Sequence, residues 1–395
     1  MRQPGRWSSI IGITDKLNRI VDLDHLLENI LLEARRFTSA DAGTIYLVED
    51  GMLDFRYVQN DSVPVGDRDL PLKMRIDESS IAGYVAKNRA PLKIDDAYSL
   101  EGCPFAFNDV FDRSTDYETR SILAFPLITR TDVVGVLQLI NAKDDEGKPV
   151  PFREEDIYYE NVFAMNVAVA IERAKRERAS VMKMLQMAEM RDPKETGPHV
   201  ERVAEYSVAI LKDYMQGSPE DEISEMVDKL RISAKLHDIG KVGIPDNILK
   251  KPGRLDDYER HVMKRHTILG AEIFSNPDSP WDSMARDIAL NHHERYDGKG
   301  YPGIYSGNGS VIFGKGKEGD DIPLAARIVA IADVFDALIS RRSYKDGWDE
   351  GRVLENIYSE SGKQFDPSVT ESFFRVYDKI STIRGRIDEP VHKAV

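Results

Sequence analysis

Cysteine is nearly absent from this chain of 395 residues, which contains only Cys103. One cysteine cannot form a disulfide within the chain, and it cannot supply a cysteine-rich zinc or iron–sulfur site. This composition is typical of a reducing compartment, so we expect a cytoplasmic protein in which Cys103 fills a small apolar gap.

Long apolar runs are also missing. The most apolar helical stretch, residues 162–171, reaches about half of the length that a helix needs to cross a bilayer. The first residues lack the apolar segment of a secretory signal. We therefore expect no association with a membrane.

The formal net charge of −14 leaves little basic surface. A protein that binds nucleic acid polymers needs a positively charged face, so this class of protein is not expected. If the substrate is an anion, metal ions or a few local lysine and arginine side chains must attract it.

Residues 1–172 are predicted to form an α+β domain. Its first helix is indicated by apolar residues at helical spacing, namely Leu26, Leu27, Ile30, Leu31 and Ala34. Two hairpins follow, one around a turn at Asp50-Gly51 and one in which residues 129–132 join the runs 121–128 and 133–141. Consecutive hairpins form an antiparallel sheet, and we expect helices to cover one of its faces.

The second hairpin resembles that of a GAF domain. The resemblance rests on SILAFPLI followed by VVGVLQLIN, and on Asn141-Ala142-Lys143 leading to Phe152 and Asp156. The latter segment is similar to a degraded form of the Asn-Lys-x-Phe-Asp signature of cyclic-nucleotide-binding GAF domains. GAF domains bind many ligands or none, so an unknown small ligand remains open. Asn141 and Lys143 either contact such a ligand or merely close the hairpin.

Residues 155–190 are predicted to form a linker helix, because the stretch contains neither proline nor glycine. Its apolar stripe is interrupted by Asn161 and by the polar residues 173–180. A long helix between two domains usually pairs with a second copy, so we expect a parallel homodimer through a coiled coil. A helix that lies on its own domain is the alternative.

Residues 185–385 show helical periodicity and are predicted to form an all-α domain that contains five of the eight histidines beside acidic residues. His237 and Asp238 end an amphipathic helix, where an imidazole and a carboxylate can bind the same cation. Asp238 has two oxygens and could bridge two cations. His292 and His293 point about 100° apart, so both reach one site only at a helix end or around several metals.

His266 falls in the same helical arc as four apolar residues, Tyr258, Val262, Leu269 and Ile273. Packing in the core is therefore the alternative to metal ligation for this histidine. Near the start of another predicted helix, Glu195 precedes His199 by four residues, and Thr196 can cap that helix.

Asp333 follows residues 328–332, which are apolar on every side of a helix and therefore buried. An ionised carboxylate in such a place costs several kcal/mol unless a partner compensates for it. Metal ligation is the expected compensation, and a structural ion pair is the alternative. Asp336 lies one turn further on, near the same face.

The candidate ligands are imidazoles and carboxylates without any thiolate. They are His199, His237, His266, His292, His293, Asp238, Asp333 and Glu195. Such a set suits iron, manganese or another first-row divalent metal, at more than one centre. Clustered metals about 3.5–4 Å apart commonly serve displacement at phosphorus.

The segment 185–385 resembles the HD-GYP domain, a branch of the HD phosphohydrolase superfamily. The matching pieces are ETGPHVERV, LHDIGKVGIPDNILKKPGRL, KRHTILGAEIF, HHERYDGKGYPG, IPLAARIVAIADVFDALIS and RRSYK, in this order. The resemblance implies metal-dependent hydrolysis of cyclic di-GMP to pGpG, or on to GMP, under control of the GAF domain. The alternatives are another cyclic dinucleotide, another nucleotide, or a silent receptor that has lost catalysis.

The same resemblance assigns roles to single residues. It implies that the five histidines, Asp238 and Asp333 bind metals, and that Glu195 belongs to a subgroup with three metals, so two or three divalent ions are expected, iron or manganese first. Lys241 would act on the phosphate and the attacking water together with Asp238, and Tyr301 would border the substrate.

Arg342 and Lys345 match basic residues that contact substrate phosphates, although a solvated basic pair is the alternative for them. The chain departs from the family pattern in residues 304–321, which are longer by about a dozen residues and rich in glycine. We expect this insertion to form a flexible flap beside the site.

Overall fold

The computed structural model describes residues 4–20, 22–63, 73–192, 197–305, 311–312, 316–340 and 348–388. The chain divides into two compact units, Met1–Arg178 and Ala179–Val395. Helix α5, Glu154–Arg191, begins in the first unit and ends in the second.

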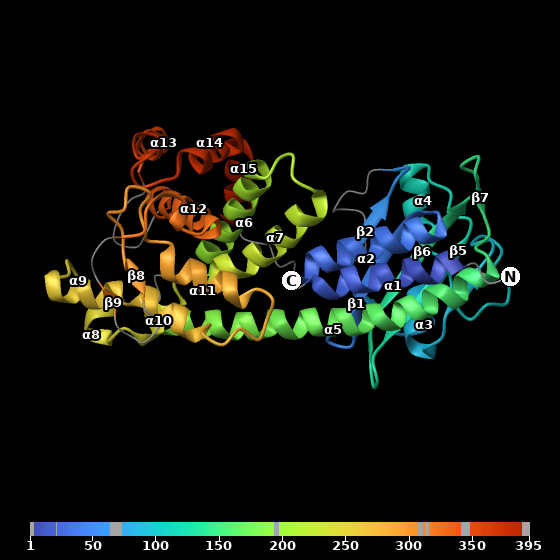
Figure 1. The fold of residues 1–395 in the computed structure, drawn as a ribbon. Coiled ribbons are helices and arrows are strands. Elements are labelled where there is room, and N and C mark those ends of the chain that lie inside the picture. The colour runs from blue at the N-terminus through green and yellow to red at the C-terminus, as the bar shows by residue number, and fades with distance from the viewer. Residues whose placement is uncertain are drawn as a thin grey trace. The chain divides into compact units, whose positions relative to one another are not determined.

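The first unit contains an antiparallel sheet with helices beside it (Figure 1). Its strand order is β3-β2-β1-β6-β5-β4, and β7 pairs with β6. Its strands are β1 (Ala40–Glu49), β2 (Met52–Asn60), β3 (Lys73–Arg75), β4 (Leu92–Ile94), β5 (Ile122–Ile128), β6 (Val133–Lys143) and β7 (Pro149–Val150). Both predicted hairpins are confirmed. Asp50 and Gly51 have φ angles of 52° and 74°, which suit the tight turn between β1 and β2.

The alternation of side chains along the strands gives this sheet two apolar faces. Ile45 and Leu137 belong to the face that packs on α1 (Pro4–Arg19), α2 (Leu23–Thr38) and α5. Tyr46 and Val136, their neighbours in sequence, belong to the opposite face. That second face packs against α3 (Ile81–Asn88) and the segment that leads to α4 (Val110–Thr115).

Asn141 holds the end of β6 to the segment that precedes β5. Its Oδ1 accepts hydrogen bonds from the backbone N–H groups of Arg120 (2.7 Å) and Ser121 (3.2 Å). Its Nδ2 donates to the carbonyl of Glu118 at 2.8 Å. Lys143 forms an ion pair with Asp41. These contacts favour the structural interpretation of Asn141 and Lys143.

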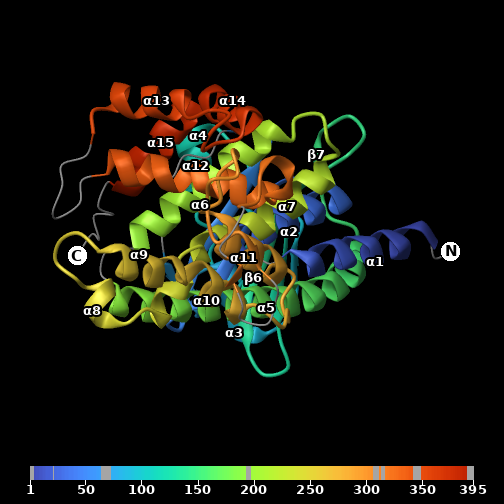
Figure 2. The same cartoon turned by 60° about the vertical axis from the view of Figure 1, so that its left-hand side comes forward.

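The second unit is mainly helical in its described parts, with one short strand pair, β8 (Ile304–Tyr305) and β9 (Val311–Ile312). Its helices are α6 (Gly197–Tyr214), α7 (Glu220–Ser233), η1 (Ala234–Leu236), η2 (Ile239–Gly243), α8 (Asp246–Leu249), α9 (Asp257–Lys264), α10 (His266–Ile273), α11 (Asp282–Asn291), η3 (Gly319–Asp321), α12 (Leu324–Ile339), α13 (Glu350–Ser359), α14 (Pro367–Arg375) and α15 (Tyr377–Asp388). Figure 2 shows α12, α13 and α14 side by side. Tyr206, Phe335 and Phe373 fill the core between α6, α12 and α14.

The expected apolar arc around His266 is wrong in part. The helix breaks at Arg265 into α9 and α10, and Tyr258 and Ile273 have exposed fractions of 74% and 45%. The break changes the helical register, so residues on its two sides do not share one face. His266 is buried at the first position of α10.

Cys103 is exposed, so its expected role as an apolar filler is wrong. Within the described ranges, we find no helix whose length and apolar character would allow it to cross a membrane.

Replacing Asn141 with Ala should lower the free energy of unfolding of the first unit by about 2–4 kcal/mol, because two backbone N–H groups lose their acceptor. Urea denaturation measures this difference. An Asn141→Gly variant keeps the left-handed backbone (φ 54°) and isolates the side-chain contribution. Asn166→Ala, which removes one exposed bond to the carbonyl of Val162, should change stability by less than about 0.5 kcal/mol. Equal losses at the two asparagines would contradict the structural role of Asn141.

Candidate metal centre

The second unit brings all the described metal-ligand candidates into two neighbouring groups. One group contains Asp238, His266, His292 and His293, and the other contains His199, His237 and Asp333. Within each group, one ligand atom per residue lies within 4.8 Å of the others. Glu195, Arg342 and Lys345 lie outside the described residues.

Most of these side chains come from helix ends. His237 and Asp238 connect η1 to η2, His266 is the first residue of α10, and His292 follows the last residue of α11. The adjacent pair His292-His293 can therefore reach one site, as expected for histidines at a helix end. His199 and Asp333 lie within α6 and α12.

The two groups meet at the carboxylate of Asp238. Its Oδ2 lies 3.4 Å from Nε2 of His237, whereas its Oδ1 lies 3.1 Å from Nε2 of His266 and 3.7 Å from Nε2 of His292. In the other group, Oδ1 of Asp333 lies 3.6 Å from Nε2 of His199 and 3.9 Å from Nε2 of His237. One oxygen of Asp238 thus faces each group, the geometry that a bridging ligand needs.

Hydrogen bonds donated by Nδ1 orient four of the imidazole rings. The acceptors are Ala234 O for His237 (2.9 Å), Met263 O for His266 (2.8 Å), Ile288 O for His292 (3.0 Å) and Asp336 Oδ2 for His199 (2.8 Å). A carbonyl oxygen can only accept, so Nδ1 carries the hydrogen in the first three rings. In a neutral ring this leaves the lone pair on Nε2, the atom that faces the site.

Asp336 supports His199 from behind. Its buried carboxylate accepts bonds from Nδ1 of His199 and from Nε (2.7 Å) and Nη2 (2.9 Å) of Arg202. Burial alone would raise the pKa of Asp336, but the bonds from Arg202 and His199 outweigh it and lower the pKa. Arg202 was not among the residues predicted from the sequence, although its position three residues after His199 places both on one side of α6.

Lys241 adds a positive charge beside Asp238. Its Nζ lies 2.7 Å from Oδ2 of Asp238 and 3.9 Å from Oδ2 of Asp192, a buried acid that was not predicted from the sequence. Burial would raise the pKa of Asp238, but the charge of Lys241 and then that of His237 hold this pKa well below its usual range. Asp238 is therefore ionised at neutral pH.

Tyr301 borders the site through His293. The two rings are stacked with centroids 4.8 Å apart, and Nζ of Lys264 lies 4.9 Å from the centre of the Tyr301 ring. Burial, followed by the charge of the neighbouring His292, holds the pKa of His293 well below its usual value. Burial likewise raises the pKa of Tyr301, so its hydroxyl remains protonated and can donate a hydrogen bond.

Glu294 stabilises the loop that carries Tyr301 through a hydrogen bond to its backbone. This buried carboxylate accepts a hydrogen bond of 2.6 Å from the backbone N–H of Gly303, and burial raises its pKa. Arg295 ties the same loop to Glu360 at 3.0 Å. A Cβ atom at Gly300 would approach the backbone of Glu294 and Arg295 to within 2.4 Å, so only glycine fits there.

A backbone contact joins the two segments that supply Asp238 and His266. A Cβ atom on Gly240 would lie 1.9 Å from the carbonyl oxygen of His266 and 2.3 Å from the N atom of Gly270. Without side chains at these two glycines, η2 packs directly on α10. Their close approach places Oδ1 of Asp238 next to Nε2 of His266.

The family model of the HD domain matches residues 159–369, which is more than half of the chain. The chain belongs to the HD domain family. A GAF domain model matches residues 22–171. Both the expected HD domain and the expected fold class, an α+β GAF domain followed by a helical domain, are confirmed.

Three curated proteins are similar to this HD domain protein. They are "3'3'-cGAMP-specific phosphodiesterase 2" of Vibrio cholerae (36% identity over 57% of this chain and 39% of the relative), "Cyclic di-GMP phosphodiesterase" of Vibrio cholerae (39%, over 53% and 42%) and "Cyclic di-GMP phosphodiesterase" of Thermotoga maritima (40%, over 52% and 51%). This chain thus spans about half or less of the length of these relatives.

Replacing Gly240 with Ala should lower stability by about 2–3 kcal/mol and weaken Mn²⁺ binding by about 10-fold or more, because η2 must move away from α10. Thermal unfolding and a Mn²⁺ titration measure the two effects. Gly385→Ala is the control, since a Cβ there meets no atom within 4 Å and alanine favours α15 by up to about 1 kcal/mol. Unchanged Mn²⁺ affinity in Gly240→Ala would show that the contact does not shape the site.

Proposed function

We propose that the protein is a metal-dependent phosphodiesterase that hydrolyses cyclic di-GMP to linear pGpG, with GMP formed if pGpG is cleaved in a second turnover. The observation that carries this proposal is the presence of two clusters of histidine and aspartate side chains that meet at Asp238. Lys241 lies beside Asp238. The names of the relatives support the substrate class, because all three act on cyclic dinucleotides.

The donor atoms of the site fit divalent metal ions. Oδ1 of Asp238 and Nε2 of His266 face each other at 3.1 Å, and Nδ1 of His266 carries its hydrogen. In the neutral ring both facing atoms are acceptors, so a cation between them would relieve their repulsion. Nε2 of His292 is likewise buried without a hydrogen-bond partner among the described residues. When bound, the metal ions would supply Lewis-acid stabilisation of charge at phosphorus.

The proposed ligands are the seven described residues of the two groups, with Asp238 shared between them. Glu195 would belong to a third metal, so we propose two or three ions per chain. Imidazole nitrogen and carboxylate oxygen donors favour iron or manganese among the first-row metals.

The remaining residues would position the substrate. Lys241 lies where its charge can offset the charge that develops on a phosphate next to Asp238. Tyr301 offers a neutral hydroxyl at the edge of the site, stacked on His293. The carboxyl group of Asp192 lies 3.9 Å from Nζ of Lys241, on the side where it can help to keep the ammonium group near the metal ligands.

A second substrate, 3'3'-cGAMP, is favoured by the name of one relative. The two cyclic dinucleotides differ in one base and share the phosphodiester ring, so metal ligands and Lys241 cannot discriminate between them. Selection must come from contacts to the bases. A silent receptor is less favoured, because every candidate ligand in the described ranges is present and gathered at the site.

We further propose a cytoplasmic, parallel homodimer through α5, with a sensor domain at 1–172, the linker at 155–190 and the catalytic domain at 185–385. The exposed fractions of Met165 (59%), Val169 (58%) and Met187 (60%) support a second copy along this helix. Regulation by the GAF domain would then act through the paired linkers. A monomer in sedimentation experiments at micromolar concentration would remove the dimer from this proposal.

Anaerobically purified protein with Fe²⁺ or Mn²⁺ should convert cyclic di-GMP to pGpG, and Asp238→Ala should lower the rate by more than about 100-fold and remove most of the metal. Chromatography of the products and elemental analysis measure both quantities, and 3'3'-cGAMP serves as the competing substrate. The control is Asp246→Ala, which removes an exposed acid that is paired with Lys250. Full metal content in Asp238→Ala would contradict the bridging role.

In Glu195→Ala, the metal content should fall by one ion per chain.

A double variant, Arg342→Ala with Lys345→Ala, should raise KM for cyclic di-GMP by about 10-fold or more while the metal content stays unchanged, because each cation would contact a substrate phosphate. Steady-state kinetics over a range of salt concentrations measure this effect. The KM of the unmodified protein should rise more steeply with salt than that of the variant. Identical KM values and salt responses would leave the alternative of a solvated basic pair.

A further inference from the structure

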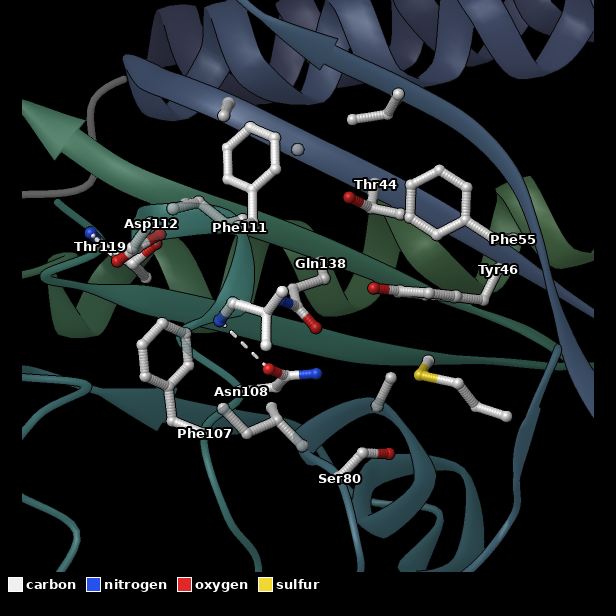
Figure 3. A pocket seen from close by; sticks show the side chains of 18 of the residues that line it. Thr44, Tyr46, Phe55, Ser80, Phe107, Asn108, Phe111, Asp112, Thr119 and Gln138 are labelled. Carbon is white, nitrogen blue, oxygen red and sulfur yellow. Dashed lines mark hydrogen bonds between the residues drawn. The ribbon is translucent and has the colours of Figure 1, made fainter. Parts of the chain in front are cut away.

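The first unit, which contains the residues that match the GAF domain model and is called the GAF unit below, contains a cavity of about 390 Å³. The cavity lies on the side of the sheet opposite α2 and α5. It lies between the strands β1, β2 and β6 and the residues around α3 and α4 (Figure 3). Phe55, Phe107 and Phe111 line it with flat apolar surface. A cavity of this size and lining is typical of a site for a small organic ligand.

The charge inside the cavity argues against an anionic ligand. Among the described residues that line the cavity, Asp112 is the one charged side chain. These lining residues include neither lysine nor arginine nor histidine. The carboxylate of Asp112 already accepts hydrogen bonds from the N–H (2.7 Å) and hydroxyl (2.9 Å) of Thr119 and from the hydroxyl of Tyr98 (2.8 Å). A phosphate or carboxylate would meet this negative charge, and no described lining residue supplies a cation to offset its desolvation.

The two residues that resemble a cyclic-nucleotide signature do not supply that cation. Asn141 is bound to the backbone of Glu118, Arg120 and Ser121, and Lys143 is paired with Asp41. Neither Asn141 nor Lys143 lines the cavity.

Gln138 is the polar group that marks the centre of the cavity. It lies on β6 between Thr44 of β1 and Ala124 of β5, on the face of the sheet that carries the apolar residues Val136 and Ile122. No hydrogen bond joins its side-chain amide to any described residue, and Figure 3 shows it pointing into the cavity. Gln138 is half-buried, so its amide is open to a ligand or a water molecule that enters the cavity and can complete its hydrogen bonds.

Asn108 offers a second amide from the opposite wall. Its Oδ1 accepts a hydrogen bond of 3.1 Å from the N–H of Val110, which fixes the orientation of the side chain and leaves Nδ2 on the cavity side (Figure 3). Gln138 thus presents an amide NH₂ group and a carbonyl oxygen, and Asn108 presents an amide NH₂ group. A planar ring with an amide-like edge complements these groups, and aromatic side chains can pack on its faces.

We propose that this cavity binds a small uncharged heteroaromatic compound, such as a free purine or pteridine base, through Gln138 and Asn108, and excludes nucleotides that carry phosphate. The ligand would therefore differ in charge from the cyclic dinucleotide that the metal centre is proposed to cleave. The GAF unit would report on a neutral base rather than on the substrate or its phosphorylated products.

Equilibrium dialysis of the full chain with radiolabelled hypoxanthine, adenine and the pteridine lumazine tests the proposal. At least one of these neutral compounds should bind at one molecule per chain. Inosine monophosphate, the matched nucleotide of hypoxanthine, should displace the bound base at least about 30-fold less effectively than unlabelled base does. No binding by any of the three compounds, or equal displacement by the nucleotide, would overturn the proposal.

Two variants locate the binding. Gln138→Met keeps the length of the side chain without its amide, and Asn108→Asp keeps the oxygen that accepts from Val110 but loses the amide donor. Each should weaken binding by about 10-fold or more, with an unchanged thermal unfolding midpoint for at least one of them. Gln186→Met, on the exposed side of α5, is the control and should bind as the unmodified chain does. Unchanged affinity in a folded Gln138→Met variant would show that the cavity is not the binding site.

Discussion

The carboxylate of Asp238 is the interaction on which the organisation of the C-terminal unit depends. One of its oxygens faces His237 and the other faces His266 and His292, so a single side chain belongs to both ligand groups. Isolated in the interior, this charge would be costly, and the positive charge of Lys241 at 2.7 Å offsets part of that cost. The short helices before and after Asp238, the start of α10 and the end of α11 all converge on this point.

Sequence reasoning could predict the elements whose signals are local. The hairpin turn at Asp50-Gly51, the apolar stripe of α2 and the helix-end position of His292 and His293 all follow from short patterns. The grouping of seven ligand candidates was predicted from chemical type and from the resemblance to the HD-GYP domain, and the structure brings these seven side chains together.

Features that depend on distant contacts could not be predicted in the same way. The ion pair of Arg202 with Asp336 joins α6 to α12 across 134 positions in the chain, and Glu294 reaches Gly303 within an irregular loop. No proline or glycine marks the break at Arg265. The apolar periodicity therefore predicted one continuous helix, with Tyr258 on its buried face, whereas Tyr258 is exposed. In each case tertiary packing outweighs the local preference of the sequence.

The direct contact between Gly240 and α10 also bears on the ionic radius that the site can accept. Side-chain ligands on independent loops can spread around a larger ion, whereas the segment that follows Asp238 already touches the backbone of His266 and Gly270 through Gly240. To accommodate a larger ion, η2 and α10 would have to move apart and lose the packing between Gly240 and Gly270. In the metal centre proposed above, this restraint would disfavour ions such as Ca²⁺, which need longer bonds and more oxygen ligands.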